Sequence, residues 1–183
     1  MKNKKKILIA VLVLALLLAG AYVLYNQFIG GAAGGQLTEQ DRVFAPDFLV
    51  YDKDGTEVRL SDYHGEPMVV NFWASWCGPC QSEMPDFQQL YMRWDDQVQF
   101  LMINLTDGEQ ETLSKASQFV REKGYTFPVF FDILSEAANA YQVYSIPTTI
   151  FIDAEGYIVA TYTGAISAET LQQGIDLILE DPS

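Results

Sequence analysis

The longest uncharged hydrophobic run of the chain extends from Ile7 to Tyr25, directly after a cluster of lysines. About 20 apolar residues in a helix cross the roughly 30 Å hydrocarbon core of a bilayer. The run therefore predicts a single transmembrane anchor over residues 7–25, or a signal that stays uncleaved. Because basic flanks stay in the cytoplasm, we expect residues 1–6 inside and the rest of the chain on the extracytoplasmic side. A cleavable signal peptide is the alternative, but the apolar run is longer than the usual signal core of about 7–15 residues, and the small residues at 30–35 come late for a cleavage site.

The pattern changes after this run. Residues 26–42 are rich in glycine and polar side chains, which predicts a flexible linker. A folded domain is expected over residues 43–183. It opens with two short extended segments on either side of an Asp/Gly turn at 52–55, a pattern that predicts a β-hairpin.

The next hydrophobic stretch is almost continuous, from Met68 to Ala74, as expected of a central strand covered on both faces. From about Pro79 to Trp94 the apolar residues instead recur at helical spacing. We therefore predict a strand that leads directly into a helix, with one apolar stripe of the helix packed on the sheet.

Strands and helices continue to alternate towards the C-terminus, which predicts an α/β sandwich with a mixed sheet. The expected elements are a strand at 98–105, a helix at 109–123 ended by Gly124, a strand at 127–131, a short helix at 135–141, a second hairpin from 148–152 and 157–162, and a helix capped by Ser167 that ends at Leu179.

The net charge of the chain excludes some classes of binding partner. The chain has 24 acidic and 11 basic residues, a formal net charge of −13, and four of its lysines lie within the first six positions. Such an acidic body repels nucleic acid and anionic lipid. We therefore expect no nucleic-acid partner, and contact with the membrane only through the single N-terminal helix.

The candidate chemistry lies between the central strand and its helix, where Cys77 and Cys80 are the only two cysteines. Free N–H groups and the helix dipole stabilise a negative sulfur at a helix start, so we expect a lowered pKa for Cys77. Cys80, one turn later on the apolar stripe, is expected to be shielded. Cys77 would attack a disulfide and Cys80 would resolve the mixed disulfide. Gly78 lets a substrate backbone approach, and Pro79 is tolerated in a first helical turn.

Two other uses of the cysteine pair are weaker. A zinc site needs four ligands, and the chain adds only one histidine, His64, which is remote in sequence and expected in a solvated loop. A purely structural disulfide over so short a loop stabilises little. We therefore expect no cofactor and no metal, only a redox-active disulfide between Cys77 and Cys80.

The segment Trp76-Cys77-Gly78-Pro79-Cys80, after the strand residues Phe72-Trp73-Ala74, resembles the active-site motif of thioredoxins. The order of elements resembles the membrane-anchored TlpA/ResA-like branch of that superfamily over roughly Val43 to Leu179. The resemblance implies a thioredoxin fold with an N-terminal β-hairpin and a central helix-strand insertion at about 109–131. It also implies a thiol-disulfide oxidoreductase, and the Gly-Pro pair resembles that of reducing thioredoxins.

The resemblance assigns further site residues. Pro147, in Ser145-Ile146-Pro147-Thr148-Thr149, corresponds to a proline that is cis and lies against the motif. The Ile146 backbone would then pair with an extended substrate. Trp76, directly before Cys77, would help to shape the substrate surface, whereas Trp73 is expected to pack in the core.

Glu83 is the third candidate catalytic residue. Its helical phase lies close to that of Cys80, so it points towards the buried side, where a carboxylate has a raised pKa and can relay protons. TlpA/ResA-like proteins carry a functional glutamate at this place. The alternative is a solvated helix glutamate, because Pro85 can shift the helical phase. Asn71 stands where cytosolic thioredoxins have a buried aspartate, and an asparagine cannot titrate.

Together these features predict an extracytoplasmic, membrane-tethered thiol-disulfide oxidoreductase that reduces disulfides in exported proteins. By resemblance, apocytochrome c is one candidate substrate, and a membrane thiol carrier of the CcdA or DsbD type is the candidate electron donor. Two alternatives remain open. One is a peroxiredoxin-like peroxidase, although Pro67 and Asn71 before Cys77 do not supply the threonine of its Pro-x-x-x-Thr-x-x-Cys context. The other is a non-catalytic tethered adaptor.

Overall fold

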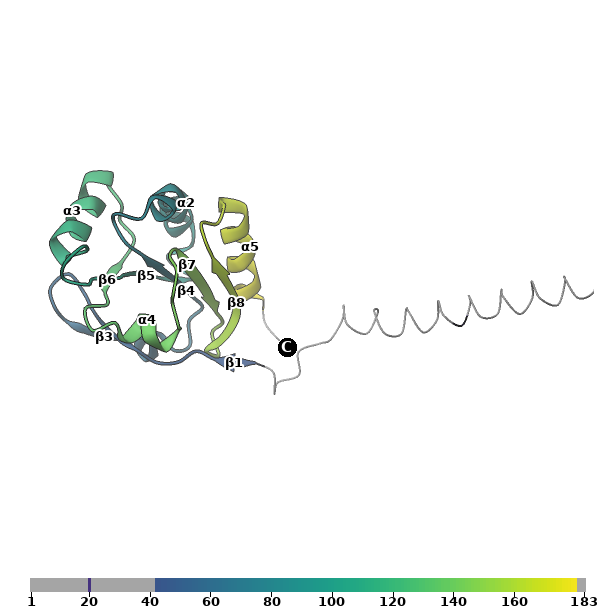
Figure 1. The fold of residues 1–183 in the computed structure, drawn as a ribbon. Coiled ribbons are helices and arrows are strands. Elements are labelled where there is room, and N and C mark those ends of the chain that lie inside the picture. The colour runs from purple at the N-terminus through teal and green to yellow at the C-terminus, as the bar shows by residue number, and fades with distance from the viewer. Residues whose placement is uncertain (1–19, 21–41, 181–183) are drawn as a thin grey trace, which may run out of the picture. The chain divides into compact units, whose positions relative to one another are not determined.

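The computed structural model describes Gly20 and residues 42–180, and its compact unit begins at Arg42 (Figure 1). The predicted basic segment at 1–6, the anchor at 7–25 apart from Gly20, and the linker at 26–42 apart from Arg42 lie outside these residues. Within the described part of the chain, no helix has both the length and the apolar character needed to cross a membrane.

An eight-stranded mixed sheet forms the centre of the domain, with the strand order β1-β8-β7-β4-β5-β6-β2-β3. Strands β4, β5 and β6 are parallel to one another, and every other neighbouring pair is antiparallel. The strands are β1 (Val43–Phe44), β2 (Leu49–Tyr51), β3 (Glu57–Arg59), β4 (Met68–Trp73), β5 (Gln99–Asn104), β6 (Val129–Phe131), β7 (Thr148–Ile152) and β8 (Tyr157–Thr163).

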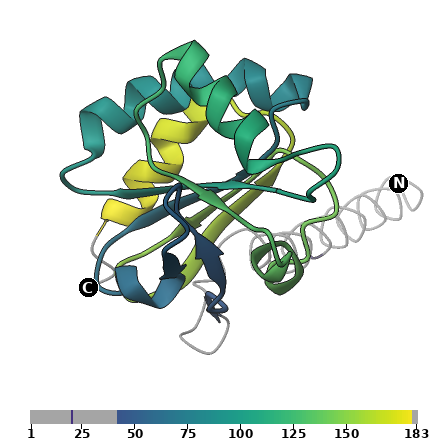
Figure 2. The same cartoon turned by 90° about the vertical axis from the view of Figure 1, so that its left-hand side faces the viewer.

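Helices cover both faces of this sheet (Figures 1 and 2). Helices α2, α3 and α5 lie on one face, and α4 lies on the other with the short 3-10 helix η2. The helices are η2 (Leu60–Tyr63), α2 (Gly78–Trp94), α3 (Leu113–Lys123), α4 (Glu136–Ala140) and α5 (Ala168–Leu179). This is the predicted thioredoxin fold, with the N-terminal β2–β3 hairpin and α3 and β6 as the central insertion.

All six residues of strand β4 are buried, which explains why its sequence is almost entirely apolar. Side chains alternate along a strand, so Val69 and Trp73 pack in the core under α2, α3 and α5, while Val70 and Phe72 pack in the core on the α4 side. Asn71 lies between Val69 and Trp73 in this alternation and therefore faces α2.

Helix α5 approaches the sheet closely through Gly174. A Cβ atom at this position would lie 2.2 Å from ring atoms of Phe151 on β7. No side chain fits in that space, so the residue that allows the contact is glycine.

The main departures from the predicted elements are at α3 and at β1. The helix expected from residue 109 begins at Leu113, because the Thr112 hydroxyl accepts the Lys115 N–H and caps the helix there. Residues before this cap instead form a loop closed by Asp107. Strand β1 was not predicted from the sequence. Its two residues pair with β8 at the edge of the sheet, a contact that local periodicity does not encode.

Candidate active site

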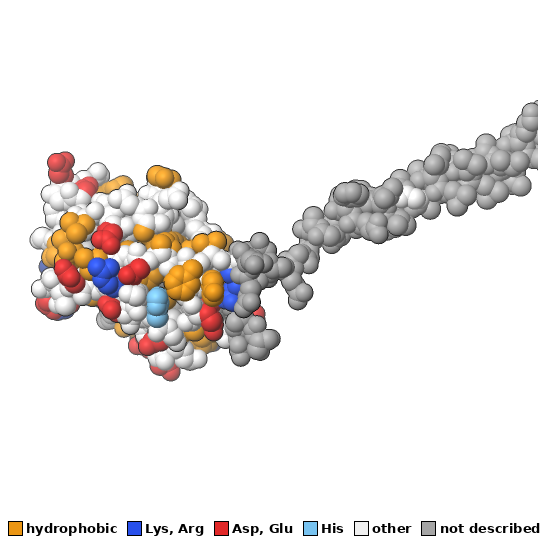
Figure 3. All heavy atoms as spheres, turned by 90° about the horizontal axis from the view of Figure 1, so that it is seen from below, with side chains coloured by type: hydrophobic (Ala, Val, Ile, Leu, Met, Phe, Trp, Pro, Cys, Tyr) orange, Lys and Arg blue, Asp and Glu red, His pale blue; other side chains and the backbone are white. Residues whose placement is uncertain are grey.

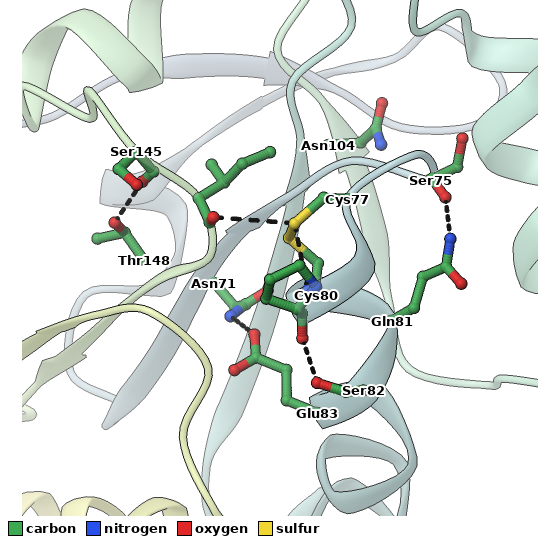
Figure 4. Close-up of a disulfide and its surroundings, with 12 residues drawn as sticks. Asn71, Ser75, Cys77, Cys80, Gln81, Ser82, Glu83, Asn104, Ser145 and Thr148 are labelled. Atoms are coloured by element: carbon green, nitrogen blue, oxygen red, sulfur yellow. Dashed lines mark hydrogen bonds between the residues drawn. A yellow bond between two sulfur atoms is a disulfide. The ribbon is translucent and has the colours of Figure 1, made fainter.

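Cys77 and Cys80 form a disulfide at the start of α2 (Figure 4). Cys77 is the N-cap residue, with an extended backbone, and its sulfur accepts the Cys80 N–H at 3.2 Å. Pro79 lies in the first turn, where its missing N–H removes no helical hydrogen bond. The helix N-terminus therefore directs a backbone donor at the sulfur expected to become the thiolate.

Both cysteines are buried in the disulfide form. Cys80 is completely buried and Cys77 is 4% exposed in the disulfide form. The predicted shielding of Cys80 is thus confirmed. Trp76, the residue before Cys77, is 50% exposed. An exposed indole beside a nearly covered sulfur fits the predicted place of Trp76 on the surface that meets a substrate.

The segment before β7 forms the facing wall of the site. The Ile146–Pro147 peptide bond is cis, as predicted. The carbonyl oxygen of Ile146 lies 3.8 Å from Cys77 Sγ, and the hydroxyl of Thr148 donates to the Ser145 carbonyl at 2.8 Å (Figure 4). A residue 69 positions away in sequence therefore lies against Cys77.

Glu83 is buried on α2, with only 2% of its surface exposed. Its carboxylate accepts hydrogen bonds from the Asn71 side chain at 2.9 Å and from the Ile166 N–H at 3.0 Å. Burial raises the pKa of Glu83 to about 7, while these two hydrogen bonds lower it and nearby Asp86 raises it. The predicted burial and raised pKa are therefore both found, and Pro85 does not turn the side chain outwards.

Asn71 connects Glu83 to strand β7. Its side-chain nitrogen donates to Glu83 and also to the Thr149 hydroxyl at 3.0 Å. Its buried side-chain oxygen has no hydrogen-bond partner among the described residues. The residue that replaces the aspartate of cytosolic thioredoxins thus serves as a hydrogen-bond donor to the helix glutamate.

Two other residues singled out from the sequence lie outside the site. Trp73 is fully buried and packs against Phe119 of α3, with ring centroids 5.8 Å apart, which confirms its predicted core position. His64 is exposed and lies beside Phe44 on the face shown in Figure 3. It precedes β4 whereas Cys77 follows it, so the two are at opposite ends of that strand. No group of three or more potential metal ligands occurs within residues 42–180.

The sequence did not reveal the contacts of Ser75. Its N–H and hydroxyl donate to the buried Glu111, and its carbonyl accepts from Gln81. Glu111 stands in a polar stretch that predicts the first turn of a helix, where a glutamate is ordinary. Only the capping threonine that follows, Thr112, hints that the helix starts later.

Comparison with known proteins places this geometry in a family. Residues 42–161 match the model of the AhpC/TSA family. The chain is similar to the thiol-disulfide oxidoreductase ResA of Geobacillus thermodenitrificans, with 35% identity over 97% of this chain and 99% of the relative.

Solved structures agree in fold. A protein assigned as the thiol:disulfide interchange protein DsbE of Chlorobium tepidum matches with a TM-score of 0.68 and 31% identity, over 76% of this chain and 97% of that one. StoA from Bacillus subtilis matches with a TM-score of 0.63 and 30% identity, over 72% and 97%. With a Cys77–Cys80 disulfide at a helix start opposite a cis-proline, the chain belongs to the ResA-like thiol-disulfide oxidoreductases of the thioredoxin superfamily.

Proposed function

We propose that this protein is anchored in the cell membrane by one N-terminal helix and reduces disulfides in exported proteins on the extracytoplasmic side. The uncharged run from Ile7 to Tyr25 after a lysine cluster supports the anchor and its orientation. The alignment with ResA, which covers 97% of this chain, must extend into that run. The pair Gly78-Pro79, which resembles the reducing thioredoxins, supports the direction of electron flow.

The exchange step is supported by one observation above all: Cys77 caps α2 and already accepts the Cys80 N–H. In the reduced protein, the Cys77 thiolate attacks one sulfur of a substrate disulfide, and the other sulfur leaves as a thiolate that takes up a proton. Cys80 then loses its proton and attacks Cys77 Sγ. The second substrate thiol is released, and the substrate has gained two electrons and two protons.

Glu83 is proposed to accept the proton that Cys80 loses. A carboxyl with a pKa of about 7 is populated in both forms near neutral pH, so it can take up and release a proton without a large energetic cost. Asn71 cannot fulfil this role, and instead holds the Glu83 carboxylate in place. The electrons would be restored by a membrane dithiol carrier, for which a CcdA- or DsbD-type protein is the candidate. Apocytochrome c is a candidate substrate.

A Cys80→Ser variant tests the proposal in intact cells, because it cannot resolve the mixed disulfide on Cys77. We expect exported proteins to accumulate covalently on Cys77, with the adduct in the membrane fraction and accessible to protease added outside the membrane. A Cys77→Ala/Cys80→Ser variant is the matched control and should trap nothing.

Mass spectrometry of the adducts identifies the substrates, with cysteine-containing apocytochrome c peptides expected among them. Absence of any adduct while the protein is present would reject the reductase proposal. Peroxide turnover by the purified protein would instead favour the peroxidase alternative. Full function of a Cys77→Ala variant would favour the non-catalytic adaptor.

A further inference from the structure

The backbone N–H, the hydroxyl and the backbone carbonyl of Ser75 each form a hydrogen bond with another side chain. Its N–H donates to Glu111 Oε1 at 2.7 Å, and its hydroxyl donates to Glu111 Oε2 at 2.6 Å. Its carbonyl oxygen accepts the Gln81 amide at 2.6 Å (Figure 4). The residue two positions before Cys77 is therefore held from two sides, by the loop after β5 and by the first turn of α2.

Glu111 is itself held firmly. It is completely buried, and Asn104 at the end of β5 donates a third hydrogen bond to its carboxylate at 2.7 Å. The Asp107 side chain accepts the Glu111 N–H at 2.8 Å, and the Glu111 carbonyl accepts the Gly108 N–H at 3.0 Å. Since charge-assisted hydrogen bonds to a buried carboxylate are strong, this loop is a rigid support rather than a flexible connection.

The position of Ser75 matters because the path from β4 to α2 is short. The Cys77 N–H donates to the Ala74 carbonyl at 3.2 Å, so residues 74–77 form a tight turn with Ser75 inside it. Rotation of that turn changes the distance between Cys77 Sγ and the Cys80 N–H, which is now 3.2 Å. Stabilisation of an anion by a helix start falls off within one turn, so a small displacement changes the stability of the thiolate.

We propose that Glu111 is a positioning residue for Cys77: by binding both donor groups of Ser75, it holds the Cys77 sulfur at the N-terminus of α2. The inserted segment between β5 and β6 thereby supports the dithiol through a side chain that is completely buried. The proposal depends on the thiol chemistry of Cys77 alone. It does not depend on the proposed direction of electron flow, the membrane anchor or the identity of the substrate.

The test compares Glu111→Ala with Glu111→Gln in the reduced full-length protein. The measurement is the pH dependence of Cys77 alkylation by iodoacetamide, with the modified cysteine identified by peptide mapping. Glu111→Ala releases Ser75, so we expect the Cys77 pKa to rise by about half to one unit. The alkylation rate below the pKa should then fall about three- to tenfold, with the alkaline limit changed less than about twofold.

The glutamine variant separates position from charge. Its amide can keep all three contacts, with the oxygen accepting from Ser75 and Asn104 and the nitrogen donating to the Ser75 hydroxyl. Loss of a negative charge near a thiolate lowers the thiol pKa. Glu111→Gln is therefore expected to leave the Cys77 pKa unchanged or slightly lower, whereas Glu111→Ala raises it.

Two further variants control for stability. Asp153 is another buried carboxylate, which holds the β7–β8 turn at the opposite end of the sheet through the Tyr157 N–H. Asp153→Ala should lower the melting temperature without moving the Cys77 pKa. Ser75→Ala, which loses only the hydroxyl contact, should move the Cys77 pKa upwards by less than Glu111→Ala and serves if the latter does not fold.

Several results would overturn the proposal. These are an unchanged or lowered Cys77 pKa in folded Glu111→Ala, equal upward shifts in the alanine and glutamine variants, or an upward shift in Asp153→Ala of the same size. If Glu111→Ala does not fold, an unchanged Cys77 pKa in Ser75→Ala has the same meaning. Success or failure of the Cys80→Ser trap does not bear on these outcomes.

Discussion

Two buried glutamates lie near the disulfide, and they differ in what binds them. Glu83 is enclosed between α2 and the sheet, and accepts one side-chain and one backbone donor. Glu111 accepts three donors, two of them from the single residue Ser75. Burial alone thus does not define the role of a carboxylate. Burial, only partly offset by its two hydrogen bonds, raises the pKa of Glu83 to about 7, so this carboxyl can hold a proton near neutral pH. The three hydrogen bonds of Glu111, two of them to Ser75, suit it to holding the chain in place.

The largest expected difference between Glu83 and Glu111 is in how each affects the pH dependence of the free energy of unfolding. The pKa of Glu83 is raised from 4.5 to about 7. Glu83 therefore contributes stability that is complete below about pH 4.5 and is lost as pH rises to about 7. The full shift corresponds to at most about 3 kcal/mol. In Glu83→Gln this loss should be absent.

Chemical denaturation of the oxidised protein at a series of pH values checks this prediction. The difference in free energy of unfolding between the wild type and Glu83→Gln should change across the window from about pH 4.5 to 7. The Cys77 and Cys80 thiols of the reduced variant should also titrate differently. If the difference in unfolding free energy does not depend on pH and the thiols titrate as in the wild type, Glu83 has no role in proton transfer.

An intermediate effect is expected from Asn71→Asp, which puts a carboxyl where a donor now contacts Glu83 at 2.9 Å. Two carboxyls at this distance cannot both ionise easily, so the pair should retain a proton to higher pH. The window of stability loss should move by about one unit or more towards alkaline pH. Thr149→Val, which removes the other partner of Asn71 without adding charge, is the matched control.

The same denaturation series measures this shift. An unmoved window in Asn71→Asp would show that the strand position and Glu83 do not share a proton. A shift of equal size in Thr149→Val would attribute the change to lost hydrogen bonding instead of carboxyl coupling.

The smallest expected effect is the energetic coupling between Glu83 and Glu111. If Glu83 moves protons and Glu111 holds position, their contributions are separate. The effects of Glu83→Gln and Glu111→Ala on the rate of reaction with a chromogenic aromatic disulfide should then multiply. Agreement within about twofold, or about 0.5 kcal/mol, is expected for independent sites. A larger interaction energy in the double variant would show that the two glutamates act as one network.

The position of Glu83 could be predicted from the sequence, whereas that of Glu111 could not. The inward direction of Glu83 follows from helical phase relative to Cys80, and both residues belong to the same helix. Its partner Ile166 lies 83 positions away and could not be inferred. Ser75 and Glu111 are 36 positions apart, and neither has a local pattern that marks it. The helix predicted from residue 109 therefore included Glu111, whereas α3 begins at Leu113.

The sequence by itself determined the dithiol, the alternation of strands and helices, and the buried face of α2, because these depend on local spacing. It also predicted the cis Ile146–Pro147 bond through its resemblance to a family. Only the tertiary structure decided that Asn71 donates to Glu83, that β1 closes the sheet edge, and that Glu111 holds Ser75. Each of these is a contact between segments remote in sequence, and such contacts exist only after the sheet has brought the strand ends together.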